Sequence, residues 1–250
     1  MKLFKLRSLI VAALLAVAIS CNKDDEPSPF LINASVHPVD FLTQNTYTTL
    51  NIEVAYVAGY QPNATSLNNL VTFLNARLNK SVGITVTQHA IPKTDKTRID
   101  VDEIRAIEKA QRITTTSGKT ITAWIMFLDT EYTESTDTQK VLGLSYNASS
   151  IVIFEKSVYN YVKPDMPSVV TLESVVIEHE FCHLLGLVDN GTPMVTSHKD
   201  TDHGAHCSNT ECLMYWKTES NINLTNVLGG DTYPTLDANC LADLKAAGGK

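Results

Sequence analysis

Two histidines, His179 and His183, stand four residues apart inside an apolar stretch with helical spacing. The apolar residues between 171 and 187 form one stripe, and Gly186 stands where a helix ends and the chain turns. On an α-helix this spacing brings both imidazole rings to one face. We therefore predict a buried helix over residues 171–187, with Thr171 as its N-cap, that aims both rings at one point.

The residue beside the first histidine adds a chemical role to this pair. Imidazole nitrogens are good ligands for Zn²⁺, and a catalytic zinc keeps one position open for water. Glu180 directly follows His179, so its carboxylate is close enough to take a proton from such a water. The pattern predicts a hydrolytic zinc site with His179 and His183 as ligands and Glu180 as general base. Two histidines packed in a core beside a surface glutamate are the alternative interpretation.

Apolar periodicity elsewhere predicts strands that alternate with helices. The expected strands are 50–60, 82–91, 121–128, 142–146 and 151–154, and the expected helices are 66–80 (with Ser66 as N-cap), 100–114 and 236–247. This order favours a mixed sheet with helices packed on it. Residues 188–234 are rich in loop signals, so the second half of the chain is expected to be smaller and irregular.

A longer pattern extends the histidine motif. The string His179–Gly186 is followed by His206, an adjacent Cys207, a second cysteine at 212 and then Met214. Together these residues resemble the metzincin metallopeptidases, and within them the archaemetzincins. The resemblance implies an α+β zincin-like fold with a mixed twisted sheet, an active-site helix and a Met-turn at Met214. It also implies a zinc metalloendopeptidase, with a catalytic domain over 48–250 that divides into halves 48–187 and 188–250.

Three residues are candidates for the third zinc ligand. In metzincins this ligand normally lies three residues after the glycine, a position that Asp189 occupies here. In archaemetzincins it is the histidine before the first cysteine, which corresponds to His206. His203 is a further candidate, because residues 187–205 intervene like an inserted loop. The resemblance favours His206.

Four cysteines follow Cys21, at positions 182, 207, 212 and 240. Archaemetzincins use a later cysteine pair for a second zinc, and this chain lacks that pair because only Cys240 follows Met214. We therefore expect a disulfide between Cys207 and Cys212 in preference to a structural zinc.

The first twenty residues are typical of an export signal. A basic start precedes an apolar run from Leu9 to Ile19 that is too short to span a bilayer. Small residues then precede Cys21, which resembles a bacterial lipoprotein signal with Cys21 as the lipidated residue. The acidic residues that follow resemble surface-export tags of Bacteroidetes lipoproteins. We expect a signal peptide at 1–20, a tether and lead-in at 21–47, and a lipoprotein exported to the outer membrane or cell surface of a Gram-negative bacterium.

The charge of the chain excludes one class of partner. The formal net charge is −7, and removing the basic signal leaves −10. An acidic chain repels phosphate backbones, so no nucleic acid is expected as a partner. The sequence predicts a monomeric zinc peptidase that acts on a protein or peptide. The alternative is a non-catalytic surface binding lipoprotein that retains a metzincin fold, although the intact Glu180 argues against it. A zinc hydrolase for another amide is a third possibility.

Overall fold

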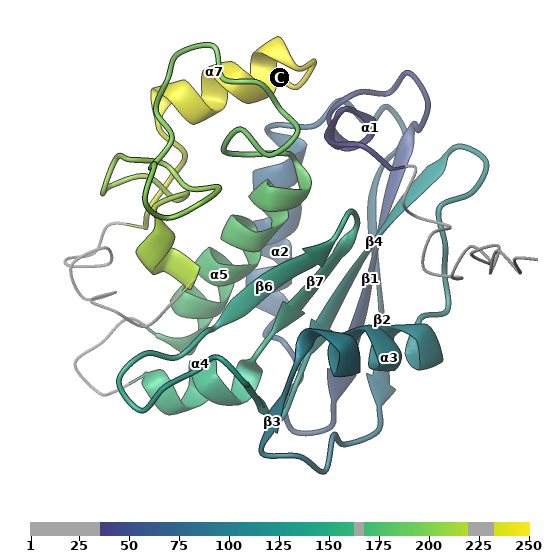
Figure 1. The fold of residues 1–250 in the computed structure, drawn as a ribbon. Helices are drawn as coiled ribbons and strands as arrows, with labels where there is room; N and C mark the ends of the chain where they lie inside the picture. The colour runs from purple at the N-terminus through teal and green to yellow at the C-terminus, as the bar shows by residue number, and fades with distance from the viewer. Residues whose placement is uncertain (1–35, 163–167, 220–232) are drawn as a thin grey trace, which may run out of the picture.

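The computed structural model describes residues 36–162, 168–219 and 233–250. The predicted signal peptide, the lipidation site at Cys21 and most of the tether lie outside the described residues. A single central sheet organises the rest of the chain (Figure 1).

This sheet has five strands (Figure 1). In spatial order they are β2 (Gly83–Ile91), β1 (Thr49–Val57), β4 (Thr120–Phe127), β7 (Ser150–Ile153) and β6 (Gly143–Asn147). Neighbouring strands run parallel, except that β6 pairs antiparallel with β7 at one edge. A separate pair consists of β3 (Arg98–Ile99) and β5 (Glu131–Tyr132). The predicted mixed sheet is confirmed.

Helices cover both faces of the sheet, because the strands are apolar on both faces. The helices are α1 (Pro38–Leu42), α2 (Ala64–Asn75), α3 (Val101–Gln111), α4 (Glu155–Tyr161), α5 (Val169–Leu184), the 3₁₀ turn η2 (Trp216–Glu219) and α7 (Ala238–Ala246). Strand β4 shows the division: Ile125 packs in the cluster shared with α2 and α5, whereas Trp124 and Met126 pack in the cluster that holds Ile104 of α3. Figure 1 shows α3 on one side of the sheet and α2 and α5 on the other.

The two predicted helix caps are wrong by a few residues. Helix α5 begins after Ser168, whose side-chain oxygen accepts a hydrogen bond from the backbone N–H of Thr171 at 3.2 Å. Helix α2 begins after Asn63, which caps it, and Ser66 lies inside the helix and donates to the carbonyl of Val170 at 3.2 Å. In both cases a polar residue further upstream already binds the free N–H groups of the first turn. Helix α5 also ends earlier than predicted, at Leu184.

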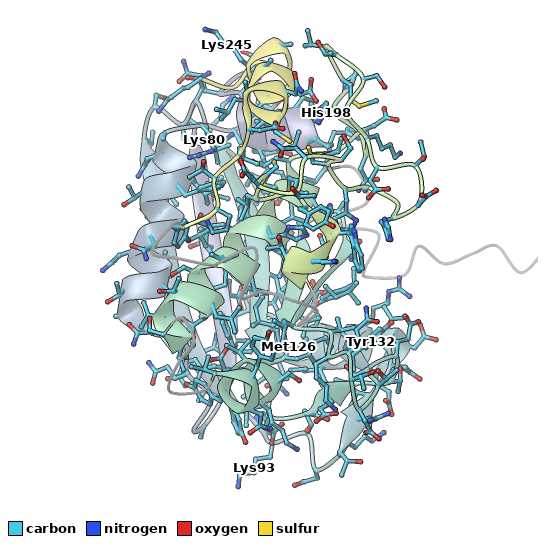
Figure 2. All side chains as sticks on the ribbon, turned by 90° about the vertical axis from the view of Figure 1, so that its left-hand side faces the viewer. Lys80, Lys93, Met126, Tyr132, His198 and Lys245 are labelled. Atoms are coloured by element: carbon cyan, nitrogen blue, oxygen red, sulfur yellow. The ribbon has the colours of Figure 1, made fainter. Side chains whose placement is uncertain are left out.

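The described part of the lead-in, residues 36–47, belongs to the folded body. Phe41 of α1 is fully buried, and its ring meets that of Phe181 on α5 edge-on at 5.9 Å. Lys80, labelled in Figure 2, donates from Nζ to the carbonyl of Asp40 at 2.6 Å and to two further carbonyls of this segment. The segment is therefore fixed against the end of the domain where α7 also lies (Figure 1).

Beyond α5 the chain is irregular, as predicted. The regular structure described within residues 188–219 consists of the turn η2 and isolated β-bridges. Helix α7 follows residue 237. Helix α5 thus lies between the sheet and this irregular half, which explains why nearly all of its residues are buried. Among the described helices, none has the length and apolar character needed to cross a membrane.

Candidate metal centre

Helix α5 presents His179 and His183 one turn apart, as the spacing predicts. Their Nε2 atoms lie 3.2 Å from each other, and the rings meet at 83° with their centroids 4.9 Å apart. Two imidazole nitrogens on a tetrahedral zinc, with Zn–N bonds of about 2.05 Å, are separated by about 3.3 Å. The pair is therefore already spaced as two ligands of one ion would be.

His206 completes a group of three histidines. Its ring stacks near that of His179 at 5.3 Å and meets that of His183 nearly at a right angle at 5.1 Å. One ligand nitrogen from each histidine lies within 4.8 Å of the other two. His179 and His206 are buried, and His183 is half-buried. The group therefore forms a compact set of three nitrogen donors with limited access to solvent.

The remaining ring nitrogen of each histidine faces a backbone carbonyl. The pairs are His179 Nδ1 with Leu213 O at 2.7 Å, His183 Nδ1 with Leu187 O at 3.1 Å, and His206 Nδ1 with His203 O at 2.5 Å. A carbonyl oxygen only accepts, so each Nδ1 carries the proton and each Nε2 keeps its lone pair. Ligating histidines are held in this way by outer partners that fix both tautomer and ring orientation. The donor set fits zinc.

The other two candidates for the third ligand lie outside this group. Asp189 has a left-handed backbone (φ 55°), and its carboxylate is 3.5 Å from the ammonium of Lys199. The imidazole of His203 is bound to Asp200. Neither side chain joins a metal-type group among the described residues. Geometry brings His206, and not Asp189 or His203, to the pair on α5.

Glu180 is fully buried beside the edge strand β6. A Cβ atom added to Gly143, the first residue of β6, would lie 2.7 Å from Cγ of Glu180 and 2.8 Å from its Oε1. The carboxylate is therefore pressed against the backbone of the edge strand, at a place where only glycine leaves room. The sequence did not single out Gly143, because nothing in its immediate neighbours distinguishes it from a turn glycine.

Electrostatics favour the metal-binding form of the histidines. Burial, and then the nearby His183 and His206, hold the pKa of His179 well below its ordinary value. A neutral imidazole is the form that offers a lone pair to a metal. The site is therefore prepared for a cation near neutral pH.

Met214 is fully buried in the turn before η2. Its carbonyl accepts a hydrogen bond from the N–H of Cys207 at 2.7 Å. The preceding carbonyl, of Leu213, is the partner of His179. This turn therefore connects the helix α5 to the segment that carries His206.

A second group of metal-type side chains lies beside the first. His198, Cys207, Asp237 and Cys240 place their ligand atoms within 4.8 Å of one another. The sulfur of Cys212 is 3.7 Å from that of Cys240. Figure 2 labels His198 near α7, at the end of the molecule opposite Lys93. Sequence reasoning missed this group, because its members come from the inserted loop, the turn before η2 and α7.

The distances in the second group match a tetrahedral metal site. The edge between two thiolates on zinc is about 3.8 Å for Zn–S bonds of about 2.3 Å. His198 Nδ1 lies 3.3 Å from Cys207 Sγ and 4.0 Å from Cys240 Sγ. Hydrogen bonds from the thiols of Cys207 and Cys240 lower the pKa of Cys212 below its ordinary value. His198, Cys207, Asp237 and Cys240 thus place one imidazole nitrogen, two sulfurs and a carboxylate oxygen together, with Cys212 next to Cys240.

The expected Cys207–Cys212 disulfide is not formed in this structure. All four described cysteines are buried free thiols. The prediction considered only neighbours in sequence, whereas the fold brings Cys240 of α7 and His198 to the same place. The preference for a disulfide over a structural metal stays a prediction.

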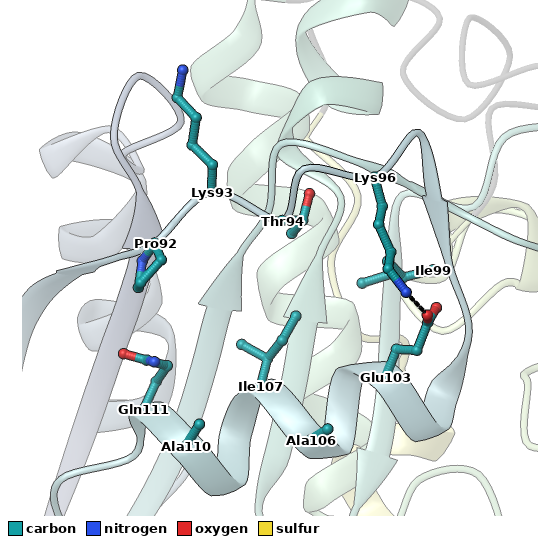
Figure 3. A pocket seen from close by; sticks show the side chains of 10 residues that line it. All are labelled: Pro92, Lys93, Thr94, Lys96, Ile99, Glu103, Ala106, Ile107, Ala110 and Gln111. Carbon is teal, nitrogen blue, oxygen red and sulfur yellow. Dashed lines mark hydrogen bonds and ion pairs between the residues drawn. The ribbon is translucent and has the colours of Figure 1, made fainter.

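A separate hollow lies on the opposite face of the sheet (Figure 3). It has a volume of about 340 Å³ between α3 and the connection from β2 to β3. Ile99 and Ile107 form its apolar floor, and Lys96 pairs with Glu103 at its rim. It contains none of the histidines or cysteines described above.

Comparison with known proteins supports the fold. The archaemetzincin of Methanopyrus kandleri matches with a TM-score of 0.52 at 13% identity, covering 80% of this chain and 96% of that one. This chain has an archaemetzincin-like fold. A zinc-dependent peptidase of Methanocorpusculum labreanum matches with a TM-score of 0.45 at 12% identity, over 77% of this chain and 99% of that one. Metalloproteinase II of Bacteroides fragilis gives 0.38 at 13%, over 88% and 58%. No protein-family model and no curated protein matches the sequence.

Proposed function

We propose that this chain is a zinc-dependent peptidase. The observation that carries the proposal is the convergence of three histidine Nε2 atoms, each with its Nδ1 held by a carbonyl, beside the buried carboxylate of Glu180. The archaemetzincin-like fold agrees with this assignment. His179, His183 and His206 are the proposed ligands, and Glu180 is the proposed general base.

The proposed metal and Glu180 have different chemical roles. Zinc bound at this site supplies a Lewis acid that lowers the pKa of water and polarises a carbonyl. Glu180 accepts the proton of the attacking water and delivers it to the departing amine. Its position against Gly143 holds the carboxylate in one orientation while its burial limits competing hydration.

The edge strand β6 is the proposed docking site for the substrate backbone. It is the last strand of the sheet in the described structure, and it begins at Gly143 beside Glu180. An extended peptide can add to such an edge through main-chain hydrogen bonds. A peptide in that register would pass directly over the three histidines, which is why we propose an endopeptidase.

We further propose a second zinc that serves structure and not catalysis. Its ligands would be His198, Cys207 and Cys240, with Asp237 or Cys212 as the fourth, which makes a closed set without a position for water. The carboxylate of Asp237 accepts a hydrogen bond from the thiol of Cys207, with Oδ2 at 3.4 Å from Sγ. This site would tie α7 and the inserted loop together.

The deciding experiment is the substitution Glu180→Gln. We expect peptidase activity on a broad peptide library to fall by about 10²- to 10⁴-fold, with the zinc content unchanged. The control Glu211→Gln changes an exposed glutamate of the irregular half and should leave activity intact. A Glu180→Gln protein as active as wild type would refute the assignment. A wild-type protein that binds zinc but cleaves nothing would favour the non-catalytic binding lipoprotein.

The cellular setting is a proposal from the sequence. We propose export as a monomeric lipoprotein, anchored through a lipid on Cys21 and facing protein or peptide substrates without nucleic acid. The mass of the mature N-terminus tests it, because lipidation adds fatty acyl groups to Cys21 and a Cys21→Ser protein would lack them.

A further inference from the structure

The ring of His206 depends on a loop with little regular structure. The connection between α5 and His206 contains no helix, and its described residues form only the isolated bridge of Lys199 with Cys207. The carbonyls that orient His179 and His183 belong to Leu213, in the turn before η2, and to Leu187, three residues after the end of α5. The carbonyl that orients His206 belongs to His203, within the loop itself. The orientation of the His206 ring therefore depends on where the carbonyl of residue 203 lies.

His203 is fixed by two contacts of its side chain. Its ring lies parallel to that of Trp216, at 6° and with centroids 4.1 Å apart. Its Nδ1 is 2.7 Å from Oδ2 of Asp200, whose backbone N–H donates to the carbonyl of His206 at 2.8 Å. The side chain is 40% exposed, so burial alone does not hold it in place. The loop is closed on itself by Asp200 and attached to the body through Trp216.

Trp216 is a suitable support for this stack. It is the first residue of η2, which packs against α5, the helix that carries the other two histidines. Lys217 places its ammonium 5.3 Å from the centre of the same indole. The indole therefore links the loop to the frame of the metal site, and stacked aromatic rings prefer this offset or parallel contact.

We propose that His203 is a positioning residue for the third ligand, and that its stack on Trp216 sets the orientation of His206. This inference rests on the proposed metal site. It adds a residue that orients a ligand without binding the metal itself. His203 acts through its backbone carbonyl, which only points at His206 while its ring stays on the indole. Outer partners of this kind are worth about 10- to 100-fold in metal affinity.

Cobalt(II) is the probe, and binding at the three-histidine site is measured as the d–d absorption that is lost in His179→Ala. The full chain is titrated with Co²⁺ as wild type, His203→Ala, Trp216→Ala and His203→Phe. The matched control is Tyr60→Ala, which removes a ring from another stacked pair far from the site, with Tyr159 at 5.9 Å. Far-ultraviolet circular dichroism shows that each variant is folded.

We expect His203→Ala and Trp216→Ala to bind Co²⁺ at the histidine site about tenfold more weakly, with an altered d–d spectrum at saturation. His203→Phe keeps a ring on Trp216 and should bind within about twofold of wild type, as the Tyr60→Ala control should. Wild-type affinity in His203→Ala would overturn the proposal. A loss in His203→Phe equal to that in His203→Ala would overturn it too, because His203 would then act through its nitrogens. If the wild type and His179→Ala bind Co²⁺ alike, the metal site itself is refuted, which is a distinct outcome.

Discussion

His198 lies 2.7 Å from Asp243 through Nε2 and Oδ2, and its other nitrogen faces the sulfur of Cys207. Both partners are buried, His198 on the inserted loop and Asp243 on α7. A carboxylate behind a histidine fixes its tautomer and raises its basicity as a ligand. This pair therefore supports His198 as a ligand of the proposed second zinc.

We predict that Asp243→Ala weakens zinc at the cysteine site by about 10- to 100-fold, because His198 loses the partner that orients it. Zinc per chain, measured by elemental analysis after dialysis against a weak chelator, should fall from about two to about one. The exposed Asp202→Ala serves as control and should keep both ions. Two ions retained in Asp243→Ala would argue against His198 as a ligand.

A count of reactive thiols tests the expected Cys207–Cys212 disulfide directly. We predict that Cys182, Cys207, Cys212 and Cys240 are all alkylated when the chain is denatured with a chelator and without reductant, because each is a free thiol. In the native zinc-loaded protein all four should be protected, since all four are buried. Peptide mass spectrometry locates the modified residues. If Cys207 and Cys212 stay unmodified in the denatured chain, the two cysteines form a disulfide.

The sequence predicted the parts of this molecule that follow local periodicity. Strand β4 and helix α5 were found because their apolar patterns have a fixed period, and His179 and His183 because one helical turn places them together. His198 and Cys240 could not be paired in this way, because no local rule says which distant residues meet. Gly143 was not predicted for the same reason. The need for glycine there comes from contact with Glu180, which is distant in sequence, and not from the neighbouring residues.

Gly143 offers a prediction about catalysis that leaves the ligands untouched. We predict that Gly143→Ala lowers kcat by about 10²-fold, because the added Cβ would lie 2.7 Å from Cγ of Glu180 and must displace its carboxylate. Zinc content should not change, since no ligand is moved. Steady-state kinetics with a peptide substrate measures the effect, and Ser145→Ala in the same strand is the control. An unchanged kcat in Gly143→Ala would show that Glu180 tolerates displacement or is not the base.

A buried pair of carboxyl groups at the start of α4 and α5 makes the stability depend on pH. Glu155 and Glu173 are both fully buried, and Glu173 accepts a hydrogen bond from the N–H of Asn63 at 2.9 Å. Burial, and then the charge of Glu173, raise the pKa of Glu155 from its ordinary value of 4.5 to about 10. Folding therefore favours the protonated form of Glu155, and the two groups share a proton at neutral pH.

The difference in proton binding between the folded and unfolded chain sets the direction in which stability changes with pH. Between pH 4.5 and about 10 the folded chain holds a proton that the unfolded chain has released, so the free energy of unfolding falls as pH rises. The loss is up to about 1.4 kcal/mol per pH unit. We predict that Glu155→Gln, which mimics the protonated group, removes this slope and raises Tm at pH 8.5 relative to wild type. Chemical unfolding of the zinc-loaded protein between pH 7.5 and 9 measures it, with the exposed Glu134→Gln as control. Equal slopes in wild type and Glu155→Gln would mean that Glu155 is ionised within the fold.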